Sequence, residues 1–581
     1  MDGQGGVYVL AREGIFAVGS EGQCCDTVRT DTFKGENVSE SLVGDSQGNV
    51  YYLVQGIYEG GCKWIKVERD GRGGVSLQEA GEVLSGEWMD GGTVYDGNLY
   101  LSYPSAGRLS RYQAISAGDI SEGETVLKWL ESNMSGGCVR EIMVLDLENI
   151  LVWYEETGEK GLFLLSKTSV EGMPEREQVR LAVFGSGTSL QASIAKFNRR
   201  SKEYYVILED YGYYDDETSA AKVRMDTALA SSNPPDLIDL YGRDLRKDME
   251  KGLLDDLIPY LARDGEPDLE DFLENVLEGY TFDGKLAGIP LAFNISITAG
   301  RLSQTEHLES WTMEDVYELM ERYPDMNLLG AADGTECNTR ENLLGSFCSD
   351  YYLEAFVDWE EGTCSFDSDD FRKLLLWVEK YGKETQEISG LVYAGYMSED
   401  DLLMENWLDF EKGAQWEVRF GEEIRLLGYP TVDGKGCAHL SSDAPFGIVA
   451  GAGNKEGAWE FLKFYLMQEV DYYPFSPRKS VMQERMEQAT KQDYIVDEPR
   501  PLYWLIIGNE SVPCYATRQE LVDQIMDFIE KIDFSADSAQ RNEIINIVTE
   551  EAEYYYRGNK SLDEVVDIIQ RRVWLMLQER K

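Results

Sequence analysis

The sequence Asn233-Pro234-Pro235-Asp236-Leu237-Ile238-Asp239-Leu240-Tyr241 opens the stretch that decides the fold, which runs on to Arg301. The two prolines predict a turn, and the apolar run after them predicts a short buried strand. A segment with helical spacing follows and reaches Gly252-Leu253-Leu254-Asp255-Asp256-Leu257-Ile258-Pro259-Tyr260-Leu261. The dipeptide Asp283-Gly284 then has the turn chemistry of a hairpin.

Three motifs therefore stand in a fixed order: "PD-L-I" at 235–238, "GLLDDLIPYL" at 252–261 and "DGKLAGIP" at 283–290. This ordered set resembles the extracellular solute-binding proteins of ABC importers, family 1, the sugar- and oligosaccharide-binding family that includes maltose-binding protein. The resemblance extends over roughly residues 178–581. It implies an α/β periplasmic-binding-protein-like fold, in which two lobes joined by a hinge enclose a cleft.

The segment after residue 177 alternates strand and helix, which predicts right-handed crossovers and a parallel sheet. The resemblance divides residues 178–581 into two lobes. We expect lobe 1 at about 178–292 and 438–475, and lobe 2 at about 293–430 and 500–581. Thr312 with Asp315, and Ser561 with Glu564, each have the spacing of a capping box at the start of a helix.

Residues 1–177 have a different pattern, with short strands between turns rich in Gly, Asp and Asn. Asn49, Asn98 and Asn149 each begin a similar aromatic or apolar strand, about 50 residues apart, which is close to the length of one propeller blade. The fold class is thus multidomain, with all-β propeller-like repeats followed by the two-lobe domain. The sequence leaves open whether the propeller is closed or truncated.

The composition excludes several partners. The formal net charge is -53, so nucleic acid and anionic lipid surfaces are not expected as partners. An apolar fraction of 43% indicates a folded protein, and the sequence contains no run of 18 apolar residues that would predict a membrane span. The extracellular, cell-surface localisation of a lipoprotein, implied by the resemblance, requires a signal or lipid segment not present in this sequence.

The sequence predicts no catalytic residue, metal site or cofactor. Its two histidines, His307 and His439, fit no catalytic triad or HExxH motif. The nine cysteines are scattered without zinc spacing, so free buried thiols are expected. Only the spacing between Cys337 and Cys348 suggests a disulfide.

Ligands of parallel α/β sheets bind beyond the carboxyl ends of the strands. This rule and the resemblance together give the predicted ligand-binding residues: Phe184, Ser186, Thr188, Tyr214, Tyr241, Arg243, Phe293, Asn294, Trp407 and Tyr515. Trp407 is expected to act as a sugar platform, with a core tryptophan as the alternative. Leu240-Tyr241 and Arg243-Asp244 depart from the maltose-binding pattern, which puts maltodextrin in doubt as the ligand.

The resemblance implies a monomeric binding protein, not an enzyme. It would capture a small hydrophilic ligand, an oligosaccharide first of all, by closure of its lobes, and present it to the permease subunits of an ABC transporter. A peptide or polyamine ligand stays open. Two alternatives remain: a glycan-recognition, adhesion or sensor protein that uses the propeller, and a polysaccharide-degrading enzyme.

Overall fold

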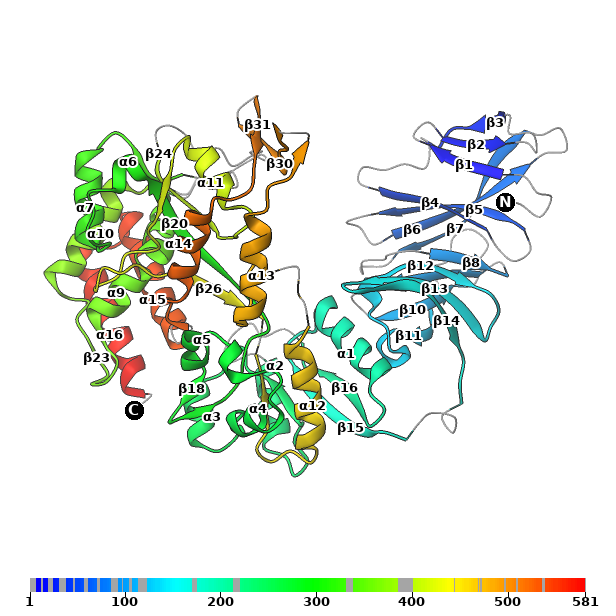
Figure 1. Ribbon diagram of the computed structural model, residues 1–581, viewed down its shortest axis with the longest axis horizontal. Helices are drawn as coiled ribbons and strands as arrows, with labels where there is room; N and C mark the ends of the chain where they lie inside the picture. Colours follow the sequence, from blue (N-terminus) through cyan, green and yellow to red (C-terminus); the bar gives the residue numbers. More distant parts are fainter. Residues whose placement is uncertain are drawn as a thin grey trace. The chain divides into compact units, whose positions relative to one another are not determined.

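A computed structural model gives the structure of the chain (Figure 1). It describes residues 7–11, 14–18, 24–30, 38–44, 48–56, 61–69, 74–84, 92–96, 98–103, 107–112, 123–169, 175–212, 220–330, 338–384, 401–443, 445–468, 470, 473–495, 498–507, 510–534 and 539–579. The chain packs as two compact units. Unit 1 comprises residues 1–215, 219–228 and 453–469, and unit 2 comprises residues 216–218, 229–452 and 470–581. The domain boundary predicted at residue 177 stays a prediction.

Unit 1 begins with four antiparallel sheets, in which successive strands pair with one another. The first sheet contains β1 (Val7–Ala11), β2 (Gly14–Val18) and β3 (Cys24–Val28). The second contains β4 (Val38–Gly44), β5 (Val50–Gly56), β6 (Gly61–Arg69) and β7 (Val75–Leu84). The third contains β8 (Gly92–Tyr95), β9 (Asn98–Tyr103), β10 (Arg108–Tyr112) and β11 (Glu124–Lys128). The fourth contains β12 (Val139–Val144), β13 (Asn149–Glu156) and β14 (Glu159–Ser166).

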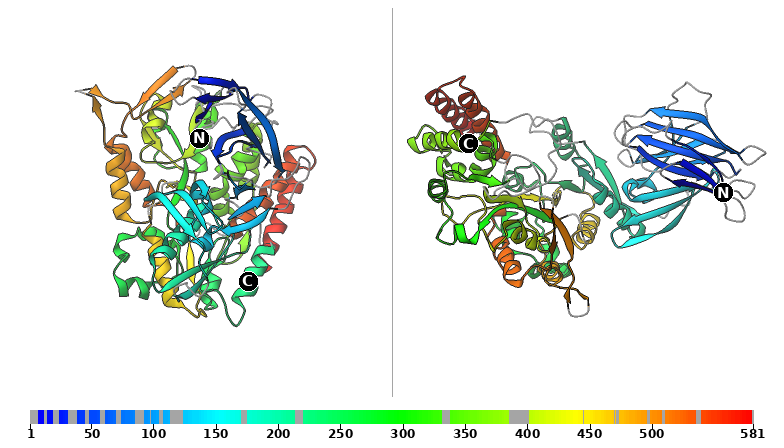
Figure 2. Two further views of the ribbon diagram at one scale, coloured as in Figure 1. Left: turned by 90° about the vertical axis from the view of Figure 1, so that its right-hand side faces the viewer. Right: turned by 90° about the horizontal axis from the view of Figure 1, so that it is seen from above.

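The predicted repeat corresponds to the second strand of a sheet. Asn49 directly precedes β5, while Asn98 and Asn149 begin β9 and β13. Apolar side chains at alternate positions of these strands face the sheets on either side, so each pair of neighbouring sheets encloses a core. The first strands of neighbouring sheets are in contact: β1 with β4, β4 with β8, and β8 with β12. An all-β N-terminal region is therefore found in the described residues, whereas a propeller stays a prediction. Figure 2 shows the same strands, in blue and cyan, from two further sides.

The rest of unit 1 is α/β. It consists of β15 (Glu177–Val183), α1 (Thr188–Arg200), β16 (Tyr204–Asp210), α2 (Ala220–Leu229) and α12 (Lys455–Leu466). β15 and β16 are parallel, as the strand-helix-strand pattern predicts. The ring of Phe197 on α1 lies edge-on to Phe461 on α12, 5.3 Å between centroids.

Unit 2 is built around the long strand β20 (Phe293–Arg301), which pairs antiparallel with three strands: β24 (Asp401–Trp407), β25 (Ile424–Leu426) and β26 (His439–Ser442). β21 (Asn327–Gly330) extends the sheet, parallel to β24. Separately, β17 (Leu237–Asp239) pairs antiparallel with β27 (Phe446–Ile448). The predicted hairpin turn is confirmed: Asp283 and Gly284 both have positive φ, between β18 (Thr281–Phe282) and β19 (Lys285–Leu286).

Helices supply two cores for this sheet. One core includes α7 (Met313–Arg322), α9 (Ser349–Phe356), α10 (Asp369–Tyr381), α15 (Ala539–Tyr556) and α16 (Leu562–Glu579). The other packs α11 (Gly413–Phe420), α13 (Lys479–Ala489) and α14 (Gln519–Ile529) onto β20. Short helices complete the unit: α3 (Leu245–Glu250), α4 (Ile258–Asp264), α5 (Glu274–Gly279), α6 (Leu302–Thr305) and α8 (Arg340–Asn342). Unit 2 also contains three small hairpins: β22 (Val357–Asp358) with β23 (Thr363–Cys364), β28 (Tyr494–Ile495) with β29 (Glu498–Pro499), and β30 (Tyr503–Ile507) with β31 (Glu510–Cys514).

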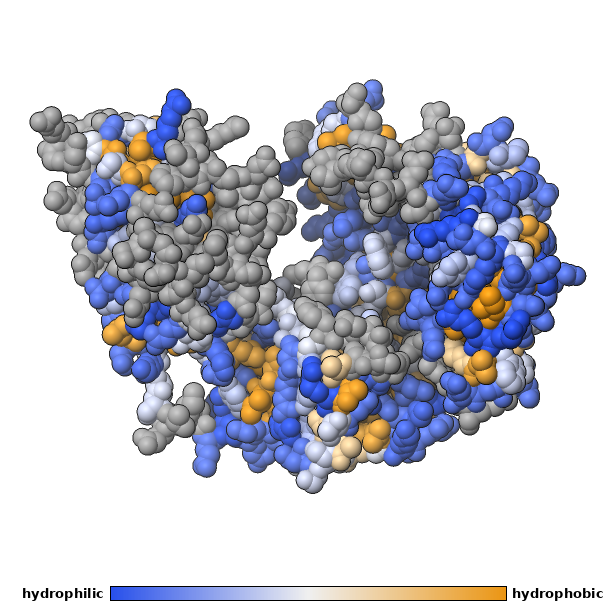
Figure 3. Space-filling model, turned by 180° about the vertical axis from the view of Figure 1, so that it is seen from behind, coloured by the Kyte–Doolittle hydropathy of each residue, from blue (hydrophilic) through white to orange (hydrophobic). Residues whose placement is uncertain are grey.

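The outer surface reflects the charge of the chain. Figure 3 shows hydrophilic residues over much of the described surface on one face, with apolar patches between them. Among the described residues, no helix combines the length and the apolar run that crossing a bilayer requires.

Candidate functional site

A polar row crosses the sheet of unit 2 where three of its strands run side by side. Ser296 on β20 lies opposite Trp407 on β24 and opposite His439 on β26. Directly paired residues of antiparallel strands point to the same face, so these three side chains share one face of the sheet. Asn294 and Glu405 lie on that face as well, because each is two residues from a member of the row.

The alternation of residues along β20 explains why this part of the face is polar. Phe293, Ile295 and Ile297 point to the opposite face, where they are buried under α11, α13 and α14. The intervening residues, Asn294 and Ser296, are polar. One strand therefore anchors the sheet on one side and presents hydrogen-bonding groups on the other.

Tyr429 connects these groups. Its hydroxyl donates a hydrogen bond to Glu405 Oε1 over 2.7 Å, and lies 3.2 Å from Ser296 Oγ. Its ring stacks on the imidazole of His439, with centroids 3.8 Å apart and planes 13° from parallel. Burial is the main reason that the pKa of Tyr429 is raised, so the hydroxyl remains a donor and fixes the Glu405 carboxylate in place.

A buried carboxylate stands behind the imidazole. Asp350 on α9 has Oδ2 3.4 Å from His439 Nε2, and its Oδ1 accepts a hydrogen bond from Arg541 over 2.8 Å. Burial raises the pKa of Asp350, but His439 and Arg541 beside it outweigh burial and lower the pKa to about 2. The carboxylate is therefore charged at neutral pH and lies beside the imidazole.

Two features of this face suit a polar ligand. Trp407 is 50% exposed at the end of β24, although it is a large apolar side chain on an otherwise covered sheet. The side-chain oxygen of Asn294 is buried but has no hydrogen-bond partner. Buried amide oxygens are nearly always hydrogen-bonded, so this oxygen can accept a hydrogen bond from a water molecule or a ligand. An exposed indole beside acceptors can hold a molecule that has C–H surfaces and hydroxyl groups.

The other predicted site residues of unit 2 are placed differently. Tyr241 is 56% exposed and follows β17, while Tyr515 is 39% exposed and follows β31. Arg243 is almost fully buried in an ion pair with Asp248, 2.6 Å from Nε to Oδ2. Phe293 is fully buried against Phe475 and Phe534, which leaves its ring no surface for a ligand.

Four predicted site residues belong to unit 1, and the structure describes three of them. Phe184 is buried at the end of β15. Ser186 is held by Asp210, whose Oδ2 accepts hydrogen bonds from both its backbone N–H and its Oγ over 2.8 Å. Thr188 is exposed at the start of α1. Tyr214 lies outside the described residues, and the ligand-binding role of all these residues stays a prediction.

Sequence reasoning missed Glu405, Ser296, Tyr429 and His439. His439 was considered only as a catalytic group, and Tyr429 lies between a glycine and a proline with no motif of its own. The alternation in β20, with Asn294 and Ser296 between apolar residues, was the one available signal for this face.

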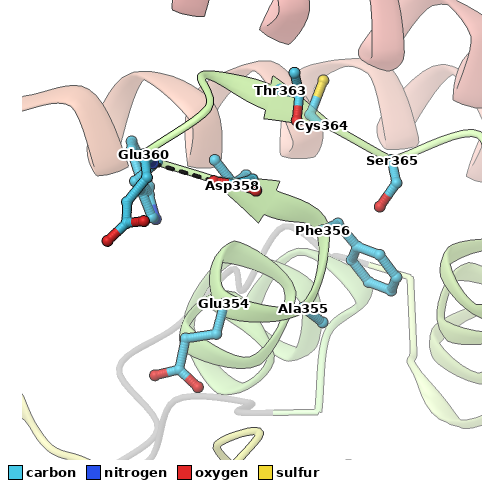
Figure 4. Close-up of a pocket in the computed structure, with 10 residues that line it drawn as sticks. Glu354, Ala355, Phe356, Asp358, Glu360, Thr363, Cys364 and Ser365 are labelled. Atoms are coloured by element: carbon cyan, nitrogen blue, oxygen red, sulfur yellow. Dashed lines mark hydrogen bonds between the residues drawn. The ribbon is translucent and has the colours of Figure 1, made fainter.

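A separate surface pocket lies at the hairpin β22–β23 (Figure 4). It has a volume of about 470 Å³ and is lined by Glu354, Ala355, Phe356, Val357, Asp358, Trp359, Glu360, Thr363, Cys364 and Ser365. Asp358 accepts a hydrogen bond from the backbone N–H of Glu360 over 3.1 Å, so that carboxylate stabilises the turn. The pocket thus follows from the shape of the hairpin.

In the described part of the chain, no cluster of three or more His, Cys, Asp or Glu residues could hold a metal ion. Cys348 is a free, buried thiol. Its predicted disulfide partner, Cys337, lies outside the described residues, and Cys348 is not in a disulfide.

Residues 192–473 match the family model of bacterial extracellular solute-binding proteins, slightly less than half of the chain. The matched segment contains β20, β24 and β26, and with them the polar row. The solute-binding protein fold is therefore supported for this segment.

The solved structures that resemble the chain include the sugar-binding protein MalE from Xanthomonas citri, with 17% identity, a TM-score of 0.44, and coverage of 69% of this chain and 98% of that chain. A solute-binding protein from Agrobacterium radiobacter K84 in complex with ribitol has 15% identity, a TM-score of 0.44, and coverage of 69% and 99%. Scores below 0.5 do not by themselves define a shared fold. No curated protein matches this chain.

Proposed function

We propose that this chain is an extracellular solute-binding protein that captures a small hydrophilic ligand for an ABC importer. The match of residues 192–473 to bacterial extracellular solute-binding proteins carries the proposal. The polar row supports it, because a half-exposed Trp407 and the unmatched Asn294 oxygen lie within the matched segment.

The ligand class proposed is an oligosaccharide. Sugar rings have C–H faces that pack on an indole, and hydroxyl groups that pair with carboxylate and amide oxygens. Trp407 would take the ring face, while Glu405 and Asn294 would accept hydrogen bonds from hydroxyls. Glu405 is already oriented by the Tyr429 hydroxyl at 2.7 Å, so little ordering is required on binding.

Binding would proceed by closure of the two lobes expected from the sequence. Closure removes water from around the ligand and strengthens each hydrogen bond to it. The closed form would then be recognised by the permease subunits of the importer. This role requires an extracellular location at the cell surface, and binding rather than bond cleavage.

The N-terminal sheets would form a propeller-like array. Support comes from the contacts of β1, β4, β8 and β12 in sequence order, and from the core that each pair of neighbouring sheets encloses. In a propeller, the first strands line a common axis and the blades pack face to face. A crystal structure of the full chain would test this arrangement directly.

Calorimetric titration with a panel of mono- and oligosaccharides tests the proposed function. At least one sugar should bind, and a hundredfold excess over its Kd should stabilise the fold by about 2.7 kcal/mol. Trp407→Ala should weaken binding about tenfold or more, because the indole face is lost. Trp574→Ala, at a 45% exposed tryptophan of α16, is the matched control and should bind as the wild type does. Equal binding by both variants, or no binding by any sugar, would contradict the proposal.

A further inference from the structure

The outer face of the fourth sheet carries an exposed apolar patch, with Glu141 opposite Trp153 and with Glu155 and Lys160 next along β13 and β14. Met143, Trp153, Leu162 and Leu164 are 54%, 38%, 62% and 58% exposed. Trp153 lies opposite Leu162, while Leu151 lies between Met143 and Leu164 in the register of the three strands. These five residues form one continuous patch, which we call the fourth-sheet face.

In the second and third sheets, the corresponding face is covered by the next sheet of the array. In β5, Tyr51 and Leu53 are buried in the core shared with the third sheet. In β9, Tyr100 is buried in the core shared with the fourth sheet. Leu151 and Trp153 hold the same positions after Asn149 that Tyr51 and Leu53 hold after Asn49. They point outward, and the described residues provide no fifth sheet to cover them.

The other end of the array is also apolar. Val7 and Val9 on β1 are exposed, and Phe16 and Val18 lie opposite them on β2. Tyr8, Leu10 and Ile15 take the inner side and pack toward the second sheet. We call Val7, Val9, Phe16 and Val18 the first-sheet face. Arrays of repeats usually end in polar surfaces, so two apolar ends indicate an interaction surface.

We propose that these two faces pack against each other between two copies of this chain, the first-sheet face of each on the fourth-sheet face of the other. Each contact repeats the face-to-face packing that already joins the neighbouring sheets within one array. A two-fold arrangement closes on itself and leaves no face open, whereas the same contact without closure would form a filament. The proposed dimer differs from the monomer expected from the sequence and does not depend on the proposed ligand.

The net negative charge of the chain opposes the formation of this dimer. Two copies that each carry a formal charge of -53 repel one another. Salt screens this repulsion while apolar contacts persist, so the dimer should be stronger at 500 mM than at 50 mM NaCl. An interface built on ion pairs would respond to salt in the opposite way.

Sedimentation velocity of the full chain over a range of concentrations tests the proposal. The wild type should show a reversible monomer–dimer equilibrium. Leu164→Glu and Val9→Glu should each raise the dimer dissociation constant about tenfold or more, because each places a carboxylate in an apolar contact. Leu376→Glu changes an exposed leucine of α10 in unit 2 and should leave the equilibrium unchanged. A wild type that stays monomeric at every concentration would overturn the proposal.

The two variants also test how the faces are paired. If Leu164→Glu weakens the dimer and Val9→Glu does not, the fourth-sheet face packs on itself and the proposed pairing is wrong. Species that grow beyond the dimer would rule out closure. Hydrogen exchange on the wild type needs no variant: β1 and β14 should gain protection together as the concentration rises. Protection at β1 and β14 that does not change with concentration would also overturn the proposal.

Discussion

At the scale of single residues, Asp350 is the group whose environment most directly affects stability. Its pKa falls to about 2 in the folded chain, below the value of 3.8 that it has when unperturbed. A lowered pKa contributes stability above the unfolded pKa, and this contribution is lost as the pH falls through the folded pKa. Asp350→Asn should therefore destabilise the protein at pH 7 by about 2 kcal/mol or more.

Urea denaturation of the wild type and of Asp350→Asn at several pH values measures this effect. The difference in the free energy of unfolding between the two proteins should narrow as the pH falls from about 4 to about 2. Asp563→Asn is the control, since the side chain of Asp563 is 84% exposed and its ion pair with Arg372 should contribute little. If the difference in the free energy of unfolding between the wild type and Asp350→Asn does not depend on pH, the pKa of Asp350 is not lowered.

Cys62 gives a second prediction at this scale. It is fully buried between the second and third sheets, and burial raises its pKa to about 12. Only the thiolate reacts with maleimides, and almost none is present at pH 7. Mass spectrometry should find Cys62 unlabelled in the native chain and fully labelled in guanidinium chloride. Rapid labelling of Cys62 in the native chain would contradict its burial.

At the scale of elements, Gly457 allows α12 to approach β15. A Cβ at this position would lie 2.6 Å from Val179 Cγ2 and 2.7 Å from Tyr204 Cδ1. Alanine normally stabilises a helix by about 1 kcal/mol relative to glycine. Gly457→Ala should instead destabilise the protein by about 1–3 kcal/mol, because overpacking exceeds the gain in helix propensity.

Thermal unfolding with a matched alanine variant tests this. Gly453 lies just before the N-cap of α12, and a Cβ there would meet nothing within 4 Å. Gly453→Ala should change the free energy of unfolding by less than about 0.5 kcal/mol. If both variants behave alike, the close approach of α12 to β15 has no energetic role.

Local elements could be predicted from the sequence because their signals are short-range. The Thr312–Asp315 capping box and the hydrogen bonds between Ser561 and Glu564 are both found where spacing placed them. The polar row could not be predicted in the same way. It joins Ser296, Trp407 and His439, which are far apart in sequence, and their meeting depends on the register of three strands.

At the scale of the whole molecule, charge is the dominant quantity. A formal charge of -53 with a sequence pI near 4.3 means that acidic side chains repel one another at neutral pH. Raising NaCl from 10 to 500 mM should therefore raise the Tm at pH 7, measured by circular dichroism. Near pH 4.3 the net charge is close to zero and the salt effect should be much smaller. An equal shift at both pH values would indicate a general salt effect rather than screening.

The helix α12 has a consequence for synthesis on the ribosome. Trp459 and Phe461 of this helix belong to the same unit as β15 and α1, yet more than 250 residues separate them from α1 along the chain. Translation at roughly 5–20 residues per second leaves β15 and α1 exposed for ten seconds or more before α12 emerges. The apolar surface of α1 that α12 covers in the folded chain, including Phe197, is therefore exposed to solvent for that time.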